Sequence, residues 1–175
     1  IEQCRKTVAK ILGTKPAEIF FTSGGTESSN TAITTAVNDM GCKHIITAPI
    51  EHHATLHTIE HLAGTKEIKV SYVKLDTEGH VDMNHLETLL SDSAEKCLVA
   101  LMHANNEIGT MLDLVATGTI CRKYGAIFYS DTVQTIGHFP FDLQNIPVDF
   151  ISAAAHKFHG PKGIGMLYKK EGHKI

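Results

Sequence analysis

The chain has 175 residues, of which 42% are hydrophobic and 20% are charged, and its formal net charge is −3 at pH 7 with neutral histidines. This composition is typical of one globular domain that can bury a core, and the lack of a basic excess argues against a nucleic-acid partner. We find no signal-peptide pattern and no apolar run long enough to cross a membrane, so we expect a cytoplasmic protein that binds no membrane.

Helical patterns alternate with short β-rich runs along the chain. The sequence predicts helices over 2–12, 26–39, 53–63, 82–91 and 113–124, and strands over 18–23, 43–48, 68–73, 96–102, 126–131, 148–154 and 163–169. Asp82 is placed to cap one helix, and Gly41, Gly64 and Gly125 stand where three others should stop. The alternation predicts an α/β fold with a mostly parallel sheet. Only a loop joins the last two strands, so we expect that pair to be antiparallel.

Polar, small and ionisable residues follow five of the predicted strands. In chain order, these segments read TSGGTESSN, PIEHHA, HANNEIG, SDTVQ and AHK. Ligands of open α/β sheets bind at the carboxyl ends of the strands, which is where these segments gather. The sequence therefore predicts one ligand site at this edge of the sheet.

The first of these segments places Gly24, Gly25 and Thr26 at the start of a helix. Free N–H groups and the helix dipole suit a phosphate there, but a glycine turn with a hydroxyl cap explains the same letters. The pattern is neither that of a P-loop nor that of the dinucleotide-binding loop, which disfavours a nucleotide.

Four further side chains are candidates for the same site. Asp131 ends the apolar run AIFYSD, which would bury a carboxylate, and a protonated ring nitrogen, a salt bridge or a helix cap would each be a partner for it. Asn106 and Gln134 add neutral hydrogen-bonding groups. His52 offers an imidazole that could stack on a ring or move protons, and a purely structural histidine is the alternative.

Lys157 lies in the stretch SAAAHKFHGPKGIG, among small apolar residues where lysine is rare. An amine held between Ala153, Ala154, Ala155 and Phe158 would lose hydration, which favours the neutral nucleophile, and an exposed turn lysine is the alternative. A phosphate cradle, a stacking ring, an acid for a pyridinium nitrogen and a lysine for a Schiff base are together the requirements of pyridoxal 5′-phosphate. We therefore predict this cofactor.

The segments FTSGGTESSN, EHHATL, HANNEIGT, SDTVQTIG and AHKFHGPKGIG together resemble the NifS-type cysteine desulfurases, a group of class V aminotransferase-like enzymes. The resemblance covers nearly the whole chain, in order. It implies a three-layer α/β/α large domain of fold type I with a seven-stranded sheet. Because both ends of the chain look cut, we expect residues 1–175 to be a fragment that lacks an N-terminal segment and a C-terminal small domain.

The resemblance also implies a role for each candidate residue. Lys157 would form the Schiff base and act as the catalytic base, Asp131 would pair with the pyridine nitrogen, and His52 would stack on the ring. The remaining candidates would contact ring substituents (Asn106, and Gln134 near the phenolic oxygen) or hold the phosphate (Gly25, Thr26 and His156).

One position departs from the family pattern. Ala154 stands where the family commonly has a serine that also binds the phosphate, so one hydroxyl contact is missing. Ser152 lies too far back along its strand to be taken as the replacement.

The implied reaction removes sulfur from L-cysteine, leaving L-alanine and an enzyme persulfide for iron–sulfur cluster assembly or other sulfur transfer. The family's sulfur-accepting cysteine sits on a serine-rich loop downstream of the lysine. None of Cys4, Cys42, Cys97 and Cys121 does so, since all four lie in predicted helices or strands and read as reduced thiols. The arginine for the substrate carboxylate would also come from later sequence, so we expect the chain to bind the cofactor weakly and to be inactive alone.

The resemblance implies a homodimer in the full-length protein and delivery of sulfur to acceptor or scaffold proteins. Two alternatives stay open: a selenocysteine lyase or class V aminotransferase, and a non-catalytic domain of the same fold. His53, His57 and His61 recur at four-residue steps and could present a metal site, but no fourth ligand is evident, so we expect a solvated helix face and no metal.

Overall fold

The computed structural model describes residues 1–173, whose strands form one seven-stranded sheet in the order β1-β7-β6-β5-β4-β2-β3. The strands are β1 (Ile19–Thr22), β2 (His44–Thr47), β3 (Lys69–Tyr72), β4 (Cys97–Ala100), β5 (Ile127–Asp131), β6 (Phe150–Ala154) and β7 (Gly165–Lys169). Strands β2 to β6 pair in parallel, and β7 is antiparallel to both β6 and β1. The predicted α/β class, mostly parallel sheet and antiparallel last pair are thus confirmed.

Five α-helices lie where the sequence predicts them, with ends that shift by one or two residues. They are α1 (Glu2–Ile11), α2 (Gly25–Asn38), α3 (His53–Thr65), α4 (Met83–Ser91) and α5 (Leu114–Lys123), with short 3-10 helices η1 (Pro16–Glu18) and η2 (Ala155–Lys157). Asp82 caps α4 as predicted, because its side chain accepts a hydrogen bond of 3.0 Å from the His85 N–H. The prediction that Gly64 ends its helix is wrong, because α3 continues through it to Thr65.

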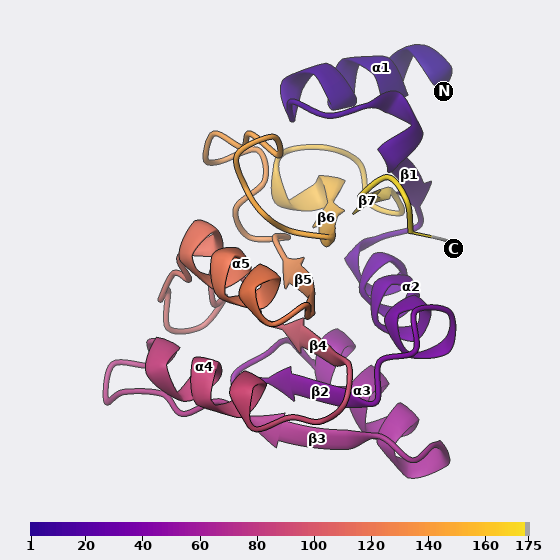
Figure 1. Ribbon diagram of the computed structural model, residues 1–175. Helices are drawn as coiled ribbons and strands as arrows, with labels where there is room; N and C mark the ends of the chain where they lie inside the picture. The colour runs from indigo at the N-terminus through magenta and orange to yellow at the C-terminus, as the bar shows by residue number, and fades with distance from the viewer. Residues whose placement is uncertain (174–175) are drawn as a thin grey trace.

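The sheet is the middle of three layers. Figure 1 shows α2 and α3 on one face and α4 and α5 on the other. Successive residues of each central strand serve opposite faces, as the two-residue period of a strand requires. In β5, for example, Phe128 packs in the cluster with α4 and α5, whereas Ile127 and Tyr129 pack in the cluster with α2 and α3.

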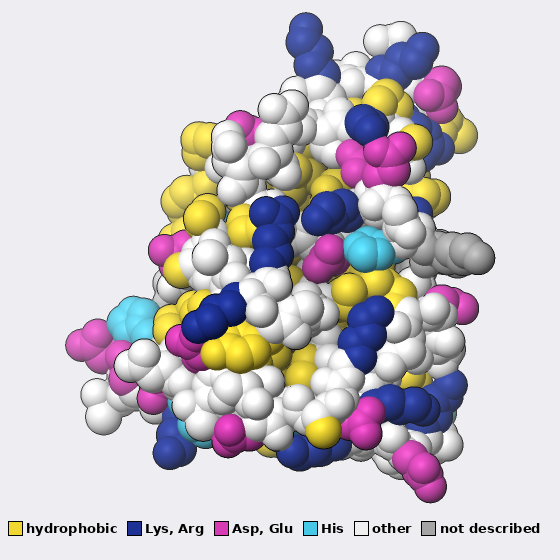
Figure 2. Space-filling model, in the orientation of Figure 1, with side chains coloured by type: hydrophobic (Ala, Val, Ile, Leu, Met, Phe, Trp, Pro, Cys, Tyr) yellow, Lys and Arg dark blue, Asp and Glu magenta, His cyan; other side chains and the backbone are white. Residues whose placement is uncertain are grey.

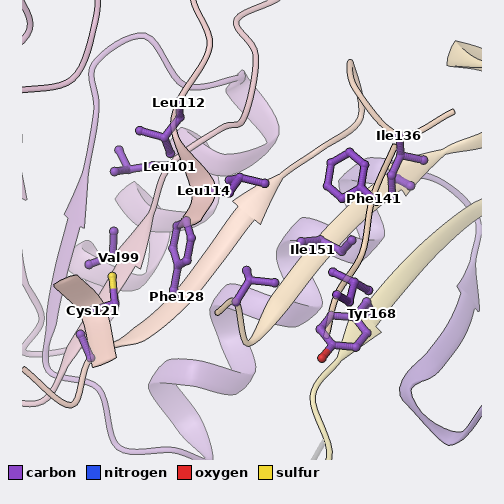
Figure 3. Close-up of a cluster of buried hydrophobic side chains, with 14 of the residues drawn as sticks. Val99, Leu101, Leu112, Leu114, Cys121, Phe128, Ile136, Phe141, Ile151 and Tyr168 are labelled. Atoms are coloured by element: carbon purple, nitrogen blue, oxygen red, sulfur yellow. The ribbon is translucent and has the colours of Figure 1, made fainter. Parts of the chain in front are cut away.

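The cluster on the α5 face is the larger of the two (Figure 3). It joins Leu101 beside β4, Phe128 of β5 and Ile151 of β6 to Leu114 and Cys121 of α5. Each large apolar side chain buried in this way contributes about 1.5–3 kcal/mol to the free energy of unfolding. The parallel strands are thereby fixed side by side, so that the segments following β2, β4, β5 and β6 leave from one edge of the sheet.

The surface agrees with the balanced composition. Basic and acidic side chains are interspersed over the face drawn in Figure 2. Within residues 1–173, the helices are too short or too polar to cross a membrane.

Two helical glycines give a matched test of the packing. A Cβ on Gly118 of α5 would lie 2.2 Å from the Pro147 carbonyl oxygen, whereas a Cβ on Gly64 of α3 would meet no atom within 4 Å. We expect Gly118→Ala to lower the free energy of unfolding by about 1–3 kcal/mol through overpacking. Gly64→Ala should raise it by up to about 1 kcal/mol, because alanine favours the helix.

Urea unfolding followed by circular dichroism measures both changes. Shifts of the same sign in the two variants would contradict the placement of α5 against Pro147.

Candidate active site

A cavity of about 270 Å³ opens at the carboxyl edge of the sheet. The structure brings all eight residues predicted from the sequence into its wall. These residues are Gly25, Thr26, His52, Asn106, Asp131, Gln134, His156 and Lys157. They come from the start of α2, from the start of α3 and from the segments that follow β4, β5 and β6. Gly25 and Lys157, which are 132 positions apart in the sequence, thus share one site.

The start of α2 forms one end of this cavity. Gly24 is the N-cap residue and Gly25 is the first helical residue. Within residues 1–173 no side chain caps this helix start, so the alternative of a turn capped by a hydroxyl is wrong. The first N–H groups of a helix have no partner within it and are available to an anion. A Cβ on Gly25 would lie 2.7 Å from Val133 Cγ2 and 3.7 Å from Ala154 Cβ, so only glycine fits this close approach.

Asp131 ends β5 at the floor of the cavity and is 6% exposed. Its Oδ1 accepts a 2.9 Å hydrogen bond from the Val133 N–H, and no ion pair involves it within residues 1–173. Burial raises the pKa of Asp131, while the Val133 hydrogen bond, the nearby His52 and, more weakly, Lys157 act in the opposite direction. A cationic ligand in the cavity would therefore be a strong partner for this carboxylate.

Lys157 is exposed, which corrects the expectation of an amine held among buried alanines. Ala153 and Ala154 are buried in β6, but the strand ends at Ala154 and the chain leaves the sheet through η2. The Lys157 side chain consequently lines the mouth of the cavity that contains Asp131, rather than lying in the core.

The loop that carries Lys157 is held by contacts that the sequence reasoning missed. His138 Nε2 donates a 2.8 Å hydrogen bond to the Lys157 carbonyl oxygen. Gly137, at φ 83°, allows Phe158 to approach so closely that a Cβ there would lie 2.6 Å from Phe158 Cβ. The Gly160 N–H closes the loop on the Ala155 carbonyl at 2.8 Å. The only signal in the sequence is the Gly-His pair three residues after Gln134.

Glu51 is a second residue that the sequence analysis did not use. It directly precedes His52 and is 5% exposed, and its Oε1 accepts a 2.8 Å hydrogen bond from the Met102 N–H, while Oε2 has no partner within residues 1–173. Burial raises the pKa of Glu51 well above its ordinary value, and the nearby Asp131 raises it further. Burial and the neighbouring carboxyl therefore both favour the protonated form of Glu51, whereas the Val133 hydrogen bond and the nearby His52 and Lys157 favour the ionised form of Asp131.

Ser152 does not take the place of the serine missing at Ala154. Its hydroxyl is fully buried and lies 3.0 Å from the Tyr129 hydroxyl, which donates to Ser29 Oγ at 2.7 Å. Ala154 lines the cavity, whereas the residues that carry these three hydroxyls do not. Ser152 therefore does not supply the hydroxyl contact to the phosphate that Ala154 lacks.

The cysteines lie away from the cavity. Cys42, Cys97 and Cys121 are buried, and burial raises the pKa of each thiol, to about 12 for Cys42. Cys4 is exposed on α1. The expectation that all four lie in helices or strands is wrong for Cys42, which precedes β2. None of the four lines the cavity.

The histidine row of α3 brings His53 and His57 together, with ring centroids 5.2 Å apart. Over the part of the chain that the structure describes, no three histidine, cysteine or carboxylate side chains are grouped to hold a metal ion.

Comparison with known proteins agrees with this geometry. The family model described as aminotransferase class-V matches residues 1–174. The chain belongs to the class V aminotransferase family. It is 44% identical over 181 residues to "Cysteine desulfurase IscS" of Dictyoglomus turgidum, covering all of this chain and 44% of that protein. Over 178 residues it is also 44% identical to "Cysteine desulfurase IscS" of Methanosarcina thermophila, again covering all of this chain and 43% of that protein.

Solved structures of the same family superpose on this class V domain. A "NIFS-like protein" matches with a TM-score of 0.91 at 43% identity, covering 99% of this chain and 48% of that one. The apo structure of a cysteine desulfurase from Thermococcus onnurineus matches with a TM-score of 0.89 at 33% identity, covering 97% and 42%. The chain thus spans less than half the length of these relatives, and the resemblance inferred from its motifs is confirmed.

The opposite environments of two glutamates predict opposite pH dependences. The pKa of Glu51 is raised above 4.5 by burial, so the folded chain binds more protons than the unfolded chain and its stability falls as the pH rises through this range. The pKa of exposed Glu27 is lowered by hydrogen bonds from the Ser23 hydroxyl and N–H, so it stabilises the fold above pH 4.5 and loses this effect on acidification.

Glu51→Gln should accordingly gain stability relative to the parent chain as the pH rises from 4.5 to neutrality. Glu27→Gln, the control, should be less stable than the parent by a constant amount above pH 4.5, and this difference should disappear as the pH falls below 4.5. Urea unfolding at a series of pH values measures both. A Glu51→Gln difference that is flat with pH would show that Glu51 is ionised in the folded chain.

Proposed function

We propose that the protein to which this chain belongs is a pyridoxal 5′-phosphate-dependent cysteine desulfurase, and that residues 1–175 form its cofactor-binding large domain. One observation carries the proposal. The buried carboxylate of Asp131 and the amine of Lys157 line a single cavity that also contains the uncapped start of α2. The similarity to proteins named cysteine desulfurases over the whole chain supports the same function.

The residues of the cavity fit this cofactor group by group. The start of α2 at Gly25 and Thr26, together with His156, would hold the phosphate, because the helix offers unpaired N–H groups and a favourable dipole. Asp131 would pair with the protonated ring nitrogen, which gives its buried charge the partner it lacks within residues 1–173.

The remaining groups of the cavity would orient the ring. His52 would stack on one face of it, and Asn106 and Gln134 would contact its substituents. Lys157, at the mouth of the cavity, would bind the aldehyde carbon. When bound, the cofactor supplies an electron sink for the charge that develops at the substrate Cα.

Three side chains of this chain then have separate roles in the proposed reaction. The Lys157 amine moves the proton at the substrate Cα, and its exposed position lets it reach a substrate at the cavity mouth. Asp131 keeps the positive charge on the ring nitrogen, which is what draws electrons toward the ring. Burial favours the protonated form of Glu51, which would add no second negative charge beside it.

The substrate we propose is L-cysteine, which would be converted to L-alanine with its sulfur passed to a thiol as a persulfide. None of the four cysteines is placed to accept that sulfur, because three are buried and the fourth lies on α1 away from the cavity. We infer that the acceptor thiol belongs to sequence outside residues 1–175 and that this chain alone does not turn over cysteine. Iron–sulfur cluster assembly, a homodimer, sulfur-acceptor proteins and a cytoplasmic location stay predictions.

Substitution of Lys157 tests the proposed function directly. With added pyridoxal 5′-phosphate, the parent chain should become yellow, and borohydride should fix one pyridoxyl group on it, whereas Lys157→Ala should do neither. Lys162→Ala, an exposed lysine of the same segment, is the control and should behave as the parent. Absorbance and peptide mass mapping measure the result. Equal labelling of Lys157→Ala and the parent would refute the proposal.

Substitution of Ala154 tests the phosphate end. A serine there would place a hydroxyl in the cavity wall, and a hydrogen bond to a charged group is worth about 1.5–3 kcal/mol, which corresponds to at least about tenfold in affinity. We expect Ala154→Ser to tighten binding of pyridoxal 5′-phosphate by that factor in equilibrium titrations. Pyridoxal, which lacks the phosphate, is the control and should bind both chains alike. Equal gains for both ligands would contradict a phosphate at the start of α2.

A further inference from the structure

Tyr129 of β5 is fully buried on the face of the sheet that α2 and α3 cover. Its hydroxyl donates a 2.7 Å hydrogen bond to Ser29 Oγ in the second turn of α2, and Ser152 Oγ of β6 lies 3.0 Å from the same hydroxyl. Ser29 and Ser152 are fully buried as well. These three side chains, which we call the hydroxyl cluster, join α2 to two neighbouring strands.

The hydroxyl cluster reaches the start of α2 through Ser29. Ser29 Oγ donates a 2.8 Å hydrogen bond to the Gly25 carbonyl oxygen, one turn earlier in the helix. A serine hydroxyl has one hydrogen, so Ser29 accepts at its contact with Tyr129. Tyr129 gives its own hydrogen to Ser29, so Ser152 donates to Tyr129. The result is a chain of hydrogen bonds that runs in one direction, from Ser152 to the Gly25 carbonyl.

The strand that carries Tyr129 also carries the buried carboxylate of the cavity. Residues 129 and 131 are two positions apart on β5 and therefore point to the same face. Asp131 lines the cavity, whereas Tyr129 reaches α2. Burial and the nearby Asp131 raise the pKa of Tyr129, so its hydroxyl keeps the hydrogen that it donates. The same strand thus contacts both ends of the proposed cofactor site.

The start of α2 depends on such contacts because two glycines form it. Gly24 and Gly25 have no side chain to pack, and no side chain caps the helix there within residues 1–173. The Gly24 carbonyl oxygen accepts hydrogen bonds from the Thr22 and Ser28 hydroxyls at 3.0 and 3.2 Å, and the Gly25 carbonyl accepts the one from Ser29. Ser29 is the one of these three donors that also bonds to the strand of the buried carboxylate.

We propose that Tyr129 is a positioning residue for the phosphate of the cofactor, because through Ser29 it holds the Gly25 end of α2 in a fixed place relative to Asp131. The phosphate in this inference rests on the function proposed above, whereas the chain of hydrogen bonds is a property of residues 1–173 alone. A tyrosine that only filled the core would affect stability and would not distinguish ligands with and without a phosphate.

Tyr129→Phe keeps the ring and removes the hydroxyl. Ser29 Oγ and Ser152 Oγ are 3.5 Å apart and can bond to each other in this variant, so we expect it to fold. One neutral hydrogen bond corresponds to about two- to tenfold in affinity. In equilibrium titrations, pyridoxal 5′-phosphate should bind the variant more weakly than the parent by that factor, and pyridoxal should bind both alike. An equal loss for both ligands, or no loss for either, would overturn the proposal.

Ser130→Ala is the matched control. The Ser130 hydroxyl is also buried in β5, but it points to the opposite face and has no hydrogen-bond partner within residues 1–173. Its removal should leave the affinity for both ligands unchanged. A loss as large and as phosphate-specific as that of Tyr129→Phe would show that any buried hydroxyl of this strand has the effect, and would contradict the role of Tyr129.

A double-mutant cycle in the chain without cofactor tests the hydrogen-bond chain by itself. The urea midpoint of the Tyr129→Phe, Ser29→Ala double variant should fall by less than the sum of the two single shifts, because both substitutions remove the same hydrogen bond. Additive shifts would refute the link between β5 and α2, and the proposal with it.

Failure of the proposed function gives a different pattern of results. The cycle would then be non-additive, but the parent chain itself would bind pyridoxal 5′-phosphate no more tightly than pyridoxal. That outcome would refute the phosphate site, and with it the phosphate role of Tyr129, while the link between β5 and α2 would stand.

Discussion

The site depends on one buried charge, the Asp131 carboxylate at the end of β5. It is 6% exposed, it has a single N–H donor from Val133, and no cation is paired with it in residues 1–173. Keeping a carboxylate ionised in such a place is costly unless a cation arrives to share the cavity. The hydrogen bond from the Val133 N–H, the nearby His52 and the amine of Lys157 all favour the ionised form.

The parallel sheet explains how such a charge comes to face the other functional groups. Strands β2, β4, β5 and β6 lie side by side and end at one edge, so the segments that follow them converge there. The helix starts of α2 and α3 point at this edge as well, and one offers unpaired N–H groups while the other is capped by His52. Close contacts of Gly25 with Val133 and of Gly137 with Phe158 then hold the start of α2 and the lysine loop against the segment that follows β5.

Sequence patterns are sufficient for the fold and for the membership of the site, because both follow from local periodicity and from the rule that ligands bind at the carboxyl ends of strands. They fail where the answer depends on how the chain turns in space. The alanines before Lys157 are buried, but the chain leaves the sheet before the lysine, and no periodicity marks that exit. The hydrogen bond from His138 to the Lys157 carbonyl oxygen joins residues 19 positions apart, which no local pattern reports. The prediction for Gly64 fails because α3 continues through this glycine, which lies in open space.

The most direct test of the central claim is to compare two ligands: pyridoxal 5′-phosphate and its analogue with a carbon in place of the ring nitrogen. If Asp131 is a buried anion that pairs with that nitrogen, isothermal titration should show the parent chain binding the natural cofactor at least about tenfold more tightly, since a buried charge pair is worth more than 1.4 kcal/mol. The Asp131→Asn chain should no longer distinguish the two ligands. Equal affinity of the parent chain for both would contradict the account.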